Sequence, residues 1–462
     1  MTKHKTILLS MIVFPLVVGL ACTCGLLPSG PEEVVEPDVI VVDPEPTTIV
    51  QEEEPLAEPT EVIISIEPGE ELILLDTTWF QEENEVFVGF TMKNQLPDQA
   101  LKDIEYKIFL LDAEGEEIRS AWNRIHWLYP EEIDAIAYRT VLSADSGPVD
   151  EVLIEYEFSD MFEPDRPGNP LVAETIKVWE GWRNPIITGI IQNNSSSTFT
   201  NFRSDILCFD AEGNIIGGGT SNHRFIPGQG RVGFNDNLYL FGEVDSVQVF
   251  PKSISGAVEI KEENGLYDQI SILDHHFYVT RSGGLNGGVV IQNNLVDTVL
   301  KDSYILVTYF DAEGFVTTIG YRDVRYLMPG SILGVMPTFL TQSSEAEPAD
   351  FELLILPGEP ADDYELQEDV FVVNSKALKE DDANYVTINY TNGYTKTVSE
   401  MAVFILLYND AGEIIGGAVN KTDSPTPPGG SGSDDIYVFY SRDHTVEDIQ
   451  VWLAPSQFTK FE

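Results

Sequence analysis

The sequence predicts an all-β protein, with four tandem β-sandwich repeats after a disordered, acidic and proline-rich tether. A short acidic turn recurs at intervals of about 100 residues along the chain. The segments around each turn are short, rich in β-branched and aromatic residues, and bounded by Gly, Pro, Asn and Asp, as in β-sandwiches. No stretch of the mature chain shows sustained helical periodicity. At 462 residues the chain is long enough for four domains.

The charge balance restricts the partners. The chain contains 26 Lys and Arg residues against 77 Asp and Glu residues, a formal net charge of −51. Such a surface repels DNA, RNA and anionic lipid headgroups, which excludes nucleic acid as a partner. The charge is explained by a solubilising surface, with recruitment of cations or basic partners as the alternative.

Residues 1–22 have the pattern of a signal peptide. Lys3 and Lys5 precede a continuous apolar run from Ile7 to Val18, which is too short to span a membrane. The segment Gly19-Leu20-Ala21-Cys22 resembles the end of a bacterial lipoprotein signal, in which Cys22 becomes the lipidated first residue. This resemblance implies an extracytoplasmic protein of the cell envelope, anchored to the membrane through lipid at Cys22. Secretion with cleavage nearby and an uncleaved anchor are the alternatives.

Residues 23–70 form the expected tether. Prolines recur among many Glu and Asp residues, and no Lys or Arg occurs between Thr6 and Met92. Such a segment cannot bury enough apolar surface to offset its conformational entropy, and its like charges repel one another. We therefore expect an extended, disordered linker.

Four repeats follow, each with the same order of sequence features. Their predicted ranges are 71–164, 170–254, 266–358 and 366–462. Each repeat contains a run that ends in asparagine: Val86 to Asn94, Ile186 to Asn194, Gly288 to Asn294 and Tyr385 to Asn392. The next apolar run of each repeat leads into the acidic turn. A proline that marks a loop and a closing β run come after the turn.

The turns are predicted to be structural. Their first and last residues are Asp112 and Gly115, Asp210 and Gly213, Asp311 and Gly314, and Asn409 and Gly412. Asp or Asn at the first position accepts hydrogen bonds from backbone amides two residues on, and Gly supplies the positive φ that rejoins the strand. This pattern predicts a hairpin with a bulge. A calcium loop is the alternative, but calcium needs six to eight oxygens and one such turn offers two carboxylates.

The runs before the turns resemble a known motif. Ile108 to Asp112, Ile206 to Asp210, Val307 to Asp311 and Ile405 to Asn409 are similar to the motif that names the FxLYD-type domain family. The first position is Ile or Val rather than Phe, and only the fourth copy keeps Tyr. The resemblance implies immunoglobulin-like β-sandwiches of surface proteins, and it brings no catalytic residues.

The sequence contains no convincing catalytic or cofactor motif. The six histidines are scattered, and no H-E-x-x-H, G-x-S-x-G or phosphate-binding glycine loop occurs. Three cysteines, Cys22, Cys24 and Cys208, are too few for a disulfide framework. Trp122, Trp127 and Tyr129 form an aromatic cluster for which core packing and a sugar or peptide platform are alternatives. Acidic residues near Asp160 to Asp165 and at Asp362-Asp363 leave calcium binding at the domain joints as a further alternative.

These features predict a non-enzymatic, membrane-anchored surface lipoprotein. It would act as a spacer, scaffold or adhesion module towards an unidentified envelope or extracellular protein, because edge strands and loops of such domains commonly bind proteins. The alternative is a substrate- or cation-binding lipoprotein that serves a transporter or an envelope enzyme.

The lipid anchor is testable by metabolic labelling with a clickable fatty acid. We expect labelled protein from the native chain and none from Cys22→Ser, because the thiol of Cys22 is the acceptor. Cys24→Ser is the matched control and should keep the label. Label that survives in Cys22→Ser would refute the anchor.

Overall fold

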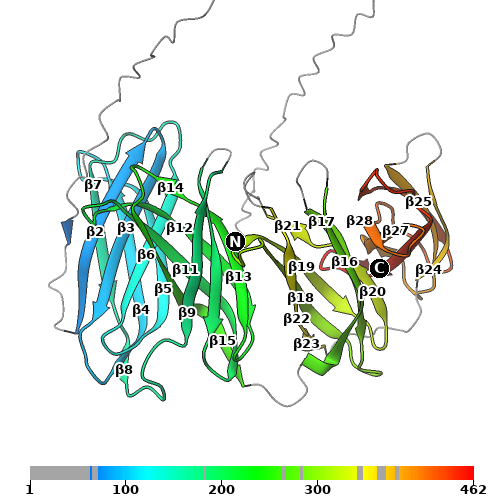
Figure 1. Ribbon diagram of the computed structural model, residues 1–462, viewed down its shortest axis with the longest axis horizontal. Helices are drawn as coiled ribbons and strands as arrows, with labels where there is room; N and C mark the ends of the chain where they lie inside the picture. The colour runs from blue at the N-terminus through cyan, green and yellow to red at the C-terminus, as the bar shows by residue number, and fades with distance from the viewer. Residues whose placement is uncertain are drawn as a thin grey trace, which may run out of the picture. The chain divides into compact units, whose positions relative to one another are not determined.

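The computed structural model describes residues 63–64, 71–181, 184–261, 267–280, 285–340, 347–361, 371–379 and 384–462. These residues form β-strands joined by turns, with one short 3-10 helix at Tyr267–Gln269 (Figure 1). The prediction of an all-β protein is confirmed. Cys22 and Asp362-Asp363, which the sequence analysis named, lie outside the described residues. By their contacts, the described residues belong to one compact unit.

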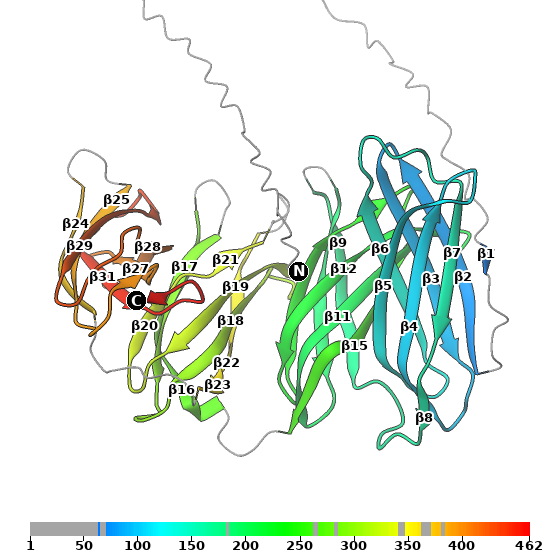
Figure 2. The same ribbon diagram turned by 180° about the vertical axis from the view of Figure 1, so that it is seen from behind.

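The strands fall into four successive two-layer units, which we call modules 1 to 4; the second sheets of modules 1 and 2 are joined edge to edge, through antiparallel pairing of Ile125 with Ile254, into one nine-stranded sheet. Each module has a three-strand sheet and a second sheet, here the hairpin sheet, whose central strand leads into the acidic turn (Figures 1 and 2). In module 1 the three-strand sheet is β2 (Leu72–Glu82), β3 (Glu85–Asn94) and β6 (Ile133–Val141). Its hairpin sheet contains β4 (Ala100–Leu111), β5 (Glu117–Leu128), β7 (Glu151–Glu157) and the short β8 (Asp160–Phe162).

Modules 2 to 4 repeat this order of strands. The three-strand sheets are β9 (Leu171–Trp179), β10 (Ile186–Asn193) and β13 (Arg231–Asn237); β16 (Ile270–Val279), β17 (Leu285–Asn293) and β20 (Ile332–Val335); and β24 (Phe371–Leu378), β25 (Tyr385–Asn392) and β29 (Ser431–Tyr437). The hairpin sheets are β11 (Ser197–Phe209), β12 (Ile215–Ile226), β14 (Tyr239–Leu240) and β15 (Ser246–Lys261); β18 (Leu300–Phe310), β19 (Val316–Leu327), β21 (Thr338–Phe339), β22 (Asp350–Leu356) and β23 (Glu359–Pro360); and β27 (Ala402–Tyr408), β28 (Ile414–Lys421), β30 (Phe439–Tyr440) and β31 (Asp448–Ala454). In module 4, β26 (Val398–Ser399) pairs with β32 (Lys460–Phe461).

Some strands extend past the predicted repeat boundaries. β15 runs to Lys261 and β23 reaches Pro360, so both pass the predicted ends at 254 and 358. Within the predicted linker, β1 (Ile63–Ile64) pairs in parallel with β7. The rest of 23–70 lies outside the described residues.

Burial along the second strand of each three-strand sheet shows which sheets are covered on both faces. In β25 buried and half-buried residues alternate, as expected for a strand with one covered face. In β3, β10 and β17 nearly every residue is buried. Another layer must therefore pack on the second face of these three sheets.

A buried asparagine closes the same strand in all four modules. Asn94, Asn193, Asn293 and Asn392 are each 0% exposed. The Nδ2 of Asn193 donates to the carbonyls of Ser197 at 2.7 Å and Pro227 at 2.9 Å, and its Oδ1 accepts from the amide of Ser195 at 2.9 Å. Corresponding bonds occur at the other three positions.

The strand ends predicted at Asn194 and Asn294 are therefore wrong by one residue. Both runs contain two consecutive asparagines, and the first of the two is the buried one. The side-chain direction alternates along a strand, so only Asn193 and Asn293 point into the sandwich while the next residue points out.

The neighbouring asparagines allow a matched test. Asn193→Ala should lower the free energy of unfolding by about 2–4 kcal/mol, because two buried carbonyls lose their donor. Asn194 is exposed, so Asn194→Ala should change the free energy of unfolding by less than about 0.5 kcal/mol. Urea denaturation followed by tryptophan fluorescence measures both. Equal effects of the two substitutions would contradict the assigned role.

Candidate functional site at the module junctions

The acidic turns use their first residue to hold the backbone. Oδ1 of Asp112 accepts from the amides of Glu114 at 3.0 Å and Glu116 at 2.8 Å. The same two bonds occur at Asp210, Asp311 and Asn409. Gly115, Gly213, Gly314 and Gly412 have φ values of 80°, 85°, 87° and 78°. Since Asn409 fills the role with a neutral amide, the position requires an acceptor and not a negative charge.

In modules 2 to 4, the strand ends beside the turn pack on the three-strand sheet of the preceding module. At the junction of modules 1 and 2, Leu207, Phe209 and Ile215 join a buried cluster with Phe80 and Phe87. The ring of Phe241 stacks on that of Phe80, with centroids 4.8 Å apart. The hairpin of module 2 thus covers the second face of β3.

The junction of modules 2 and 3 adds polar contacts to this packing. The carbonyl of Val316, just after the third turn, accepts from Nε1 of Trp179 at 3.2 Å and Oγ1 of Thr188 at 2.6 Å. Nζ of Lys177 lies 3.3 Å from the Asp311 carboxylate and 3.6 Å from the ring centroid of Trp179. Here the turn aspartate itself contacts the preceding module.

The junction of modules 3 and 4 follows the same plan. Leu406, Tyr408 and Ile414 form a buried cluster with Val290 of β17. The hydroxyl of Tyr278 donates to the carbonyl of Ile415 and accepts from the amide of Ser441. All three junctions therefore place a hairpin sheet on the preceding three-strand sheet.

Small residues allow the sheets to approach. A Cβ at Gly233 would lie 2.3 Å from Cγ2 of Thr308, and one at Gly334 would lie 2.6 Å from Cδ1 of Leu406. The pairing partners of these two glycines are Ile190 and Val290, each three residues before a buried asparagine. The matching residue in module 1 is Ala135, which pairs with Thr91.

The first junction also encloses a charged network. Lys252 is 2% exposed, and its Nζ lies 2.6 Å from Oδ1 of Asp134 and 2.9 Å from Oδ2 of Asp205. Nη2 of Arg203 lies 2.8 Å from the same Asp205 oxygen and donates to the hydroxyl of Tyr106 at 3.0 Å. Two cations and two carboxylates from both modules are thus matched. Burial raises the pKa of Asp134, and the Lys252 ammonium opposes that rise.

The second module also contains a buried serine–histidine pair. Oγ of Ser204 lies 3.0 Å from Nε2 of His223, and Phe202 stacks on the histidine ring. Both residues are buried, and burial lowers the pKa of His223 to about 3. The histidine is therefore neutral near pH 7 and enclosed in the core, where no substrate reaches the hydroxyl. Its role is in packing.

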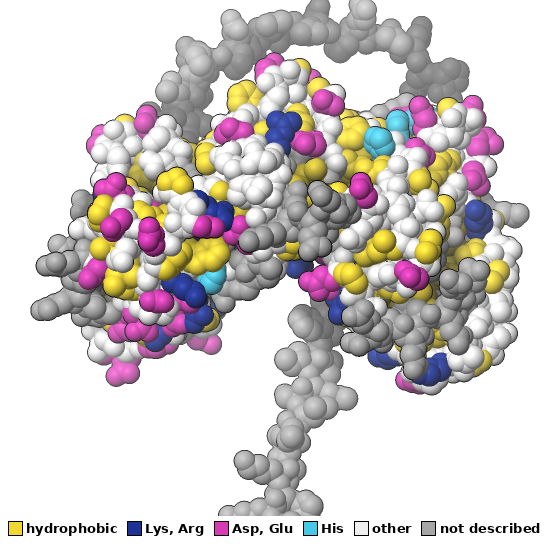
Figure 3. All heavy atoms as spheres, turned by 90° about the horizontal axis from the view of Figure 1, so that it is seen from below, with side chains coloured by type: hydrophobic (Ala, Val, Ile, Leu, Met, Phe, Trp, Pro, Cys, Tyr) yellow, Lys and Arg dark blue, Asp and Glu magenta, His cyan; other side chains and the backbone are white. Residues whose placement is uncertain are grey.

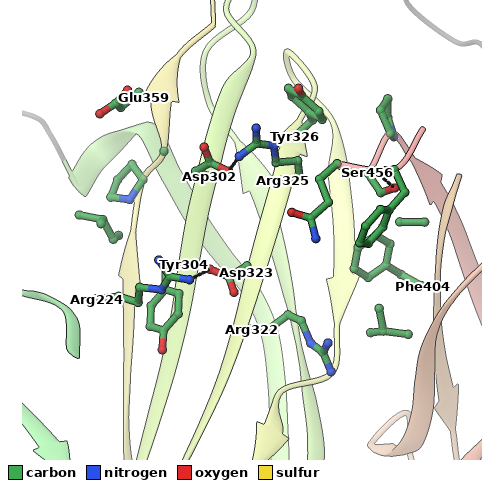
Figure 4. Close-up of a pocket in the computed structure, with 18 of the residues that line it drawn as sticks. Arg224, Asp302, Tyr304, Arg322, Asp323, Arg325, Tyr326, Glu359, Phe404 and Ser456 are labelled. Carbon is green, nitrogen blue, oxygen red and sulfur yellow. Dashed lines mark hydrogen bonds and ion pairs between the residues drawn. The ribbon is translucent and has the colours of Figure 1, made fainter. Parts of the chain in front are cut away.

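A recess of about 1040 Å³ is lined by modules 2, 3 and 4 (Figure 4). Arg325 pairs with Asp302, Arg224 lies 4.0 Å from Asp323, and Nε of Arg322 donates to the Met336 carbonyl at 3.1 Å. Burial lowers the pKa of Arg322. Tyr304, Tyr326, Phe404 and Phe458 supply aromatic surface. The recess can hold a polar or anionic group only in competition with these carboxylates.

The structure separates the remaining predicted clusters. Trp122 is 54% exposed whereas Tyr129 is buried, so the aromatic residues of module 1 do not form one platform. Asp165 pairs with Arg166 at 3.3 Å. Among the described residues, no group of three His, Cys, Asp or Glu side chains is placed to hold a metal ion. Cys208 is buried in β11, where burial raises the pKa of its thiol to about 12.

The junctions were missed by the sequence analysis, which treated each repeat separately. The available signal was the uninterrupted apolar or small character of the runs before Asn193 and Asn293, compared with the strict alternation before Asn392. A strand covered on both faces loses the polar positions of an alternating pattern.

No family model and no curated protein matches the chain. In the part of the chain that the structure describes, no helix is long and apolar enough to cross a membrane.

The charged network provides a stability test. Lys252→Met should cost about 3–5 kcal/mol of unfolding free energy, because two buried carboxylates lose their shared cation. Lys177→Met is the control at the next junction and should cost less than about 1 kcal/mol, since Lys177 is one-third exposed. Urea denaturation of the purified variants measures both values. A loss below 1 kcal/mol in Lys252→Met would show that the network does not hold the junction.

Proposed function

We propose that the chain is a non-enzymatic, membrane-anchored lipoprotein of the cell envelope that acts as a stiff spacer or scaffold. The observation that carries this proposal is the shared packing of its three junctions. Each one buries the turn-proximal end of a hairpin on the preceding three-strand sheet. A recurring buried contact between modules restricts their relative motion, and a spacer needs that restriction.

The junctions differ from those of domains that move independently. Such domains meet through modest, polar interfaces and are joined by exposed linkers. Here apolar clusters run across the junctions, and module 2 contributes Lys252 and Asp205 to a network completed by Asp134 of module 1. An arrangement of modules 1 and 2 that leaves one of these charges buried without its partner is strongly unfavourable, so the network favours this way of joining the two modules while the apolar clusters supply the attraction.

The strand order supports an immunoglobulin-like assignment. In each module the three-strand sheet combines the first, second and fifth main strands, and the hairpin sheet places the third strand between the fourth and the last. This division is typical of immunoglobulin-like sandwiches. The four copies of the motif that resembles FxLYD-type domains give independent support from the sequence.

The N-terminal segment supports an attachment to the membrane, and the surface charge restricts the possible partners. Lipid at Cys22 would hold the modules at an envelope membrane, with the part of the predicted linker that precedes β1 as the tether. Acidic side chains are spread over the face in Figure 3, and the net charge of −51 keeps the modules away from anionic surfaces. A protein of the envelope or the surroundings is the expected partner, and nucleic acid is not.

The recess supports a second candidate, a substrate-binding envelope lipoprotein. Three arginines line it in a strongly acidic chain, so an anionic substrate fits its chemistry better than a cation. The carboxylates Asp302 and Asp323 already occupy two of these arginines, which weakens this candidate relative to the spacer.

Stiffness can be measured by pulsed EPR. Spin labels at Asp145 of module 1 and Asn194 of module 2, both exposed, should give one narrow distance distribution. The protein would carry Cys22→Ser, Cys24→Ser and Cys208→Ala so that only the new cysteines react. Labels at Asn194 and Glu212, both in module 2, supply the intramodule width. A distribution between modules 1 and 2 several times wider than this reference would reject the stiff spacer.

A further inference from the structure

At each of the three junctions a hairpin sheet packs on the three-strand sheet of the preceding module. The hairpin sheet of module 1 and the three-strand sheet of module 4 take part in none of these junctions. In the described part of the chain, no sheet packs on the outer face of the module 1 hairpin sheet or of the module 4 three-strand sheet. Outward residues of β25 are half-buried, whereas their counterparts in β3, β10 and β17 are buried.

The exposed face of module 4 keeps the features of a receiving surface. Ser433 pairs with Asn389, three residues before the buried Asn392, where modules 1 to 3 have Ala135, Gly233 and Gly334. A small residue therefore occupies this position in all four modules. Thr387 is at the position of Thr188 in module 2, and Thr188 contacts the hairpin of module 3.

An exposed aromatic group lies beside this point. The rings of Tyr385 and Tyr437 are 5.2 Å apart, and those of Tyr437 and Phe439 are 4.9 Å apart. Tyr437 is 42% exposed and Phe439 59%. The residue of module 1 equivalent to Tyr385 is Phe87, which is 1% exposed because the hairpin of module 2 covers it. In module 4 the aromatic side chains in this region are exposed, whereas the equivalent region of module 1 is covered. Exposed aromatic groups of this kind are typical of a contact surface.

The exposed face of module 1 keeps the features of a docking hairpin. Phe109 and Leu111 precede its turn at the positions of Leu207 and Phe209 in module 2. Leu153 pairs with Phe109 on the adjacent strand and extends the apolar surface. Asp112 and the glutamates after it give the turn its negative charge.

A lysine lies beside the aromatic group of module 4, as one does at the second junction. At the second junction Lys177 contacts Asp311 of the incoming turn at 3.3 Å. On module 4, Lys379 lies 5.9 Å from the Tyr385 ring and pairs with the exposed Asp435 at 2.7 Å. An acidic turn that docks beside the tyrosines competes with Asp435 for Lys379.

We propose that the protein associates head to tail with a second copy of itself, the module 1 hairpin sheet of one chain docking on the module 4 three-strand sheet of the next. The contact is heterologous, so both faces remain available at the ends of a growing chain and linear assemblies form. Because each copy carries a net charge of −51, long-range repulsion opposes association and added salt screens it.

Sedimentation velocity of the full chain in detergent, from micromolar to several hundred micromolar, tests the proposal. We expect the weight-average mass to rise with concentration, and more steeply at 500 mM than at 50 mM NaCl. Phe109→Glu and Tyr437→Glu each destroy one face, and each variant alone should stay monomeric with an unchanged melting curve. Phe458→Glu, at an exposed residue outside both faces, is the control and should associate like the native chain.

The mixture of the two variants identifies the contact. Phe109→Glu keeps the module 4 face and Tyr437→Glu keeps the module 1 face, so their mixture should form a one-to-one dimer and nothing larger. A native chain that stays monomeric at all concentrations and both salts would overturn the proposal. Association that persists in either variant alone, or a mixture that stays monomeric, would overturn it as well.

Discussion

The buried asparagine that ends the second strand of each module is the interaction on which the rest depends. A side-chain amide inside a sandwich is stable only if its donors and acceptor are satisfied. Asn193 meets this requirement by bonding to the loop that follows it and to the segment before β13. These bonds connect the two sheets at one end and set the register of β10, because a shift of one residue would turn the amide outwards.

The acidic turn at the other end of the hairpin has two roles with one geometry. Inside a module its first residue caps backbone amides and its glycine adopts a positive φ. Between modules the same geometry projects the flanking apolar residues onto the preceding sheet. The charge is secondary for folding, as Asn409 shows, but at Asp311 it forms an ion pair with Lys177. One short motif thus determines both the hairpin and the junction.

Electrostatics act in opposite ways outside and inside the protein. Most acidic side chains remain in water, where they repel other anions and one another. The few buried ones are matched with cations, as in the network around Lys252. A matched network adds little net stability but strongly disfavours any arrangement that leaves a charge unpaired. It therefore specifies how modules 1 and 2 meet, whereas apolar contacts supply most of the attraction.

The sequence by itself determined the all-β class and the geometry expected at the turns, because strand alternation and turn chemistry are local and repeat in the chain. It also indicated that one strand of each repeat ends near an asparagine, but only the structure showed that these asparagines are buried and that Asn193 and Asn293, not their neighbours, point into the sandwich. Only the tertiary structure decided the junctions. Lys252, Asp134 and Asp205 are far apart in sequence, and no local pattern separates a buried ion pair from surface charge. Whether a sheet face is covered depends on the next module, so Gly233 and Ser433 gained meaning only once the sheets were stacked.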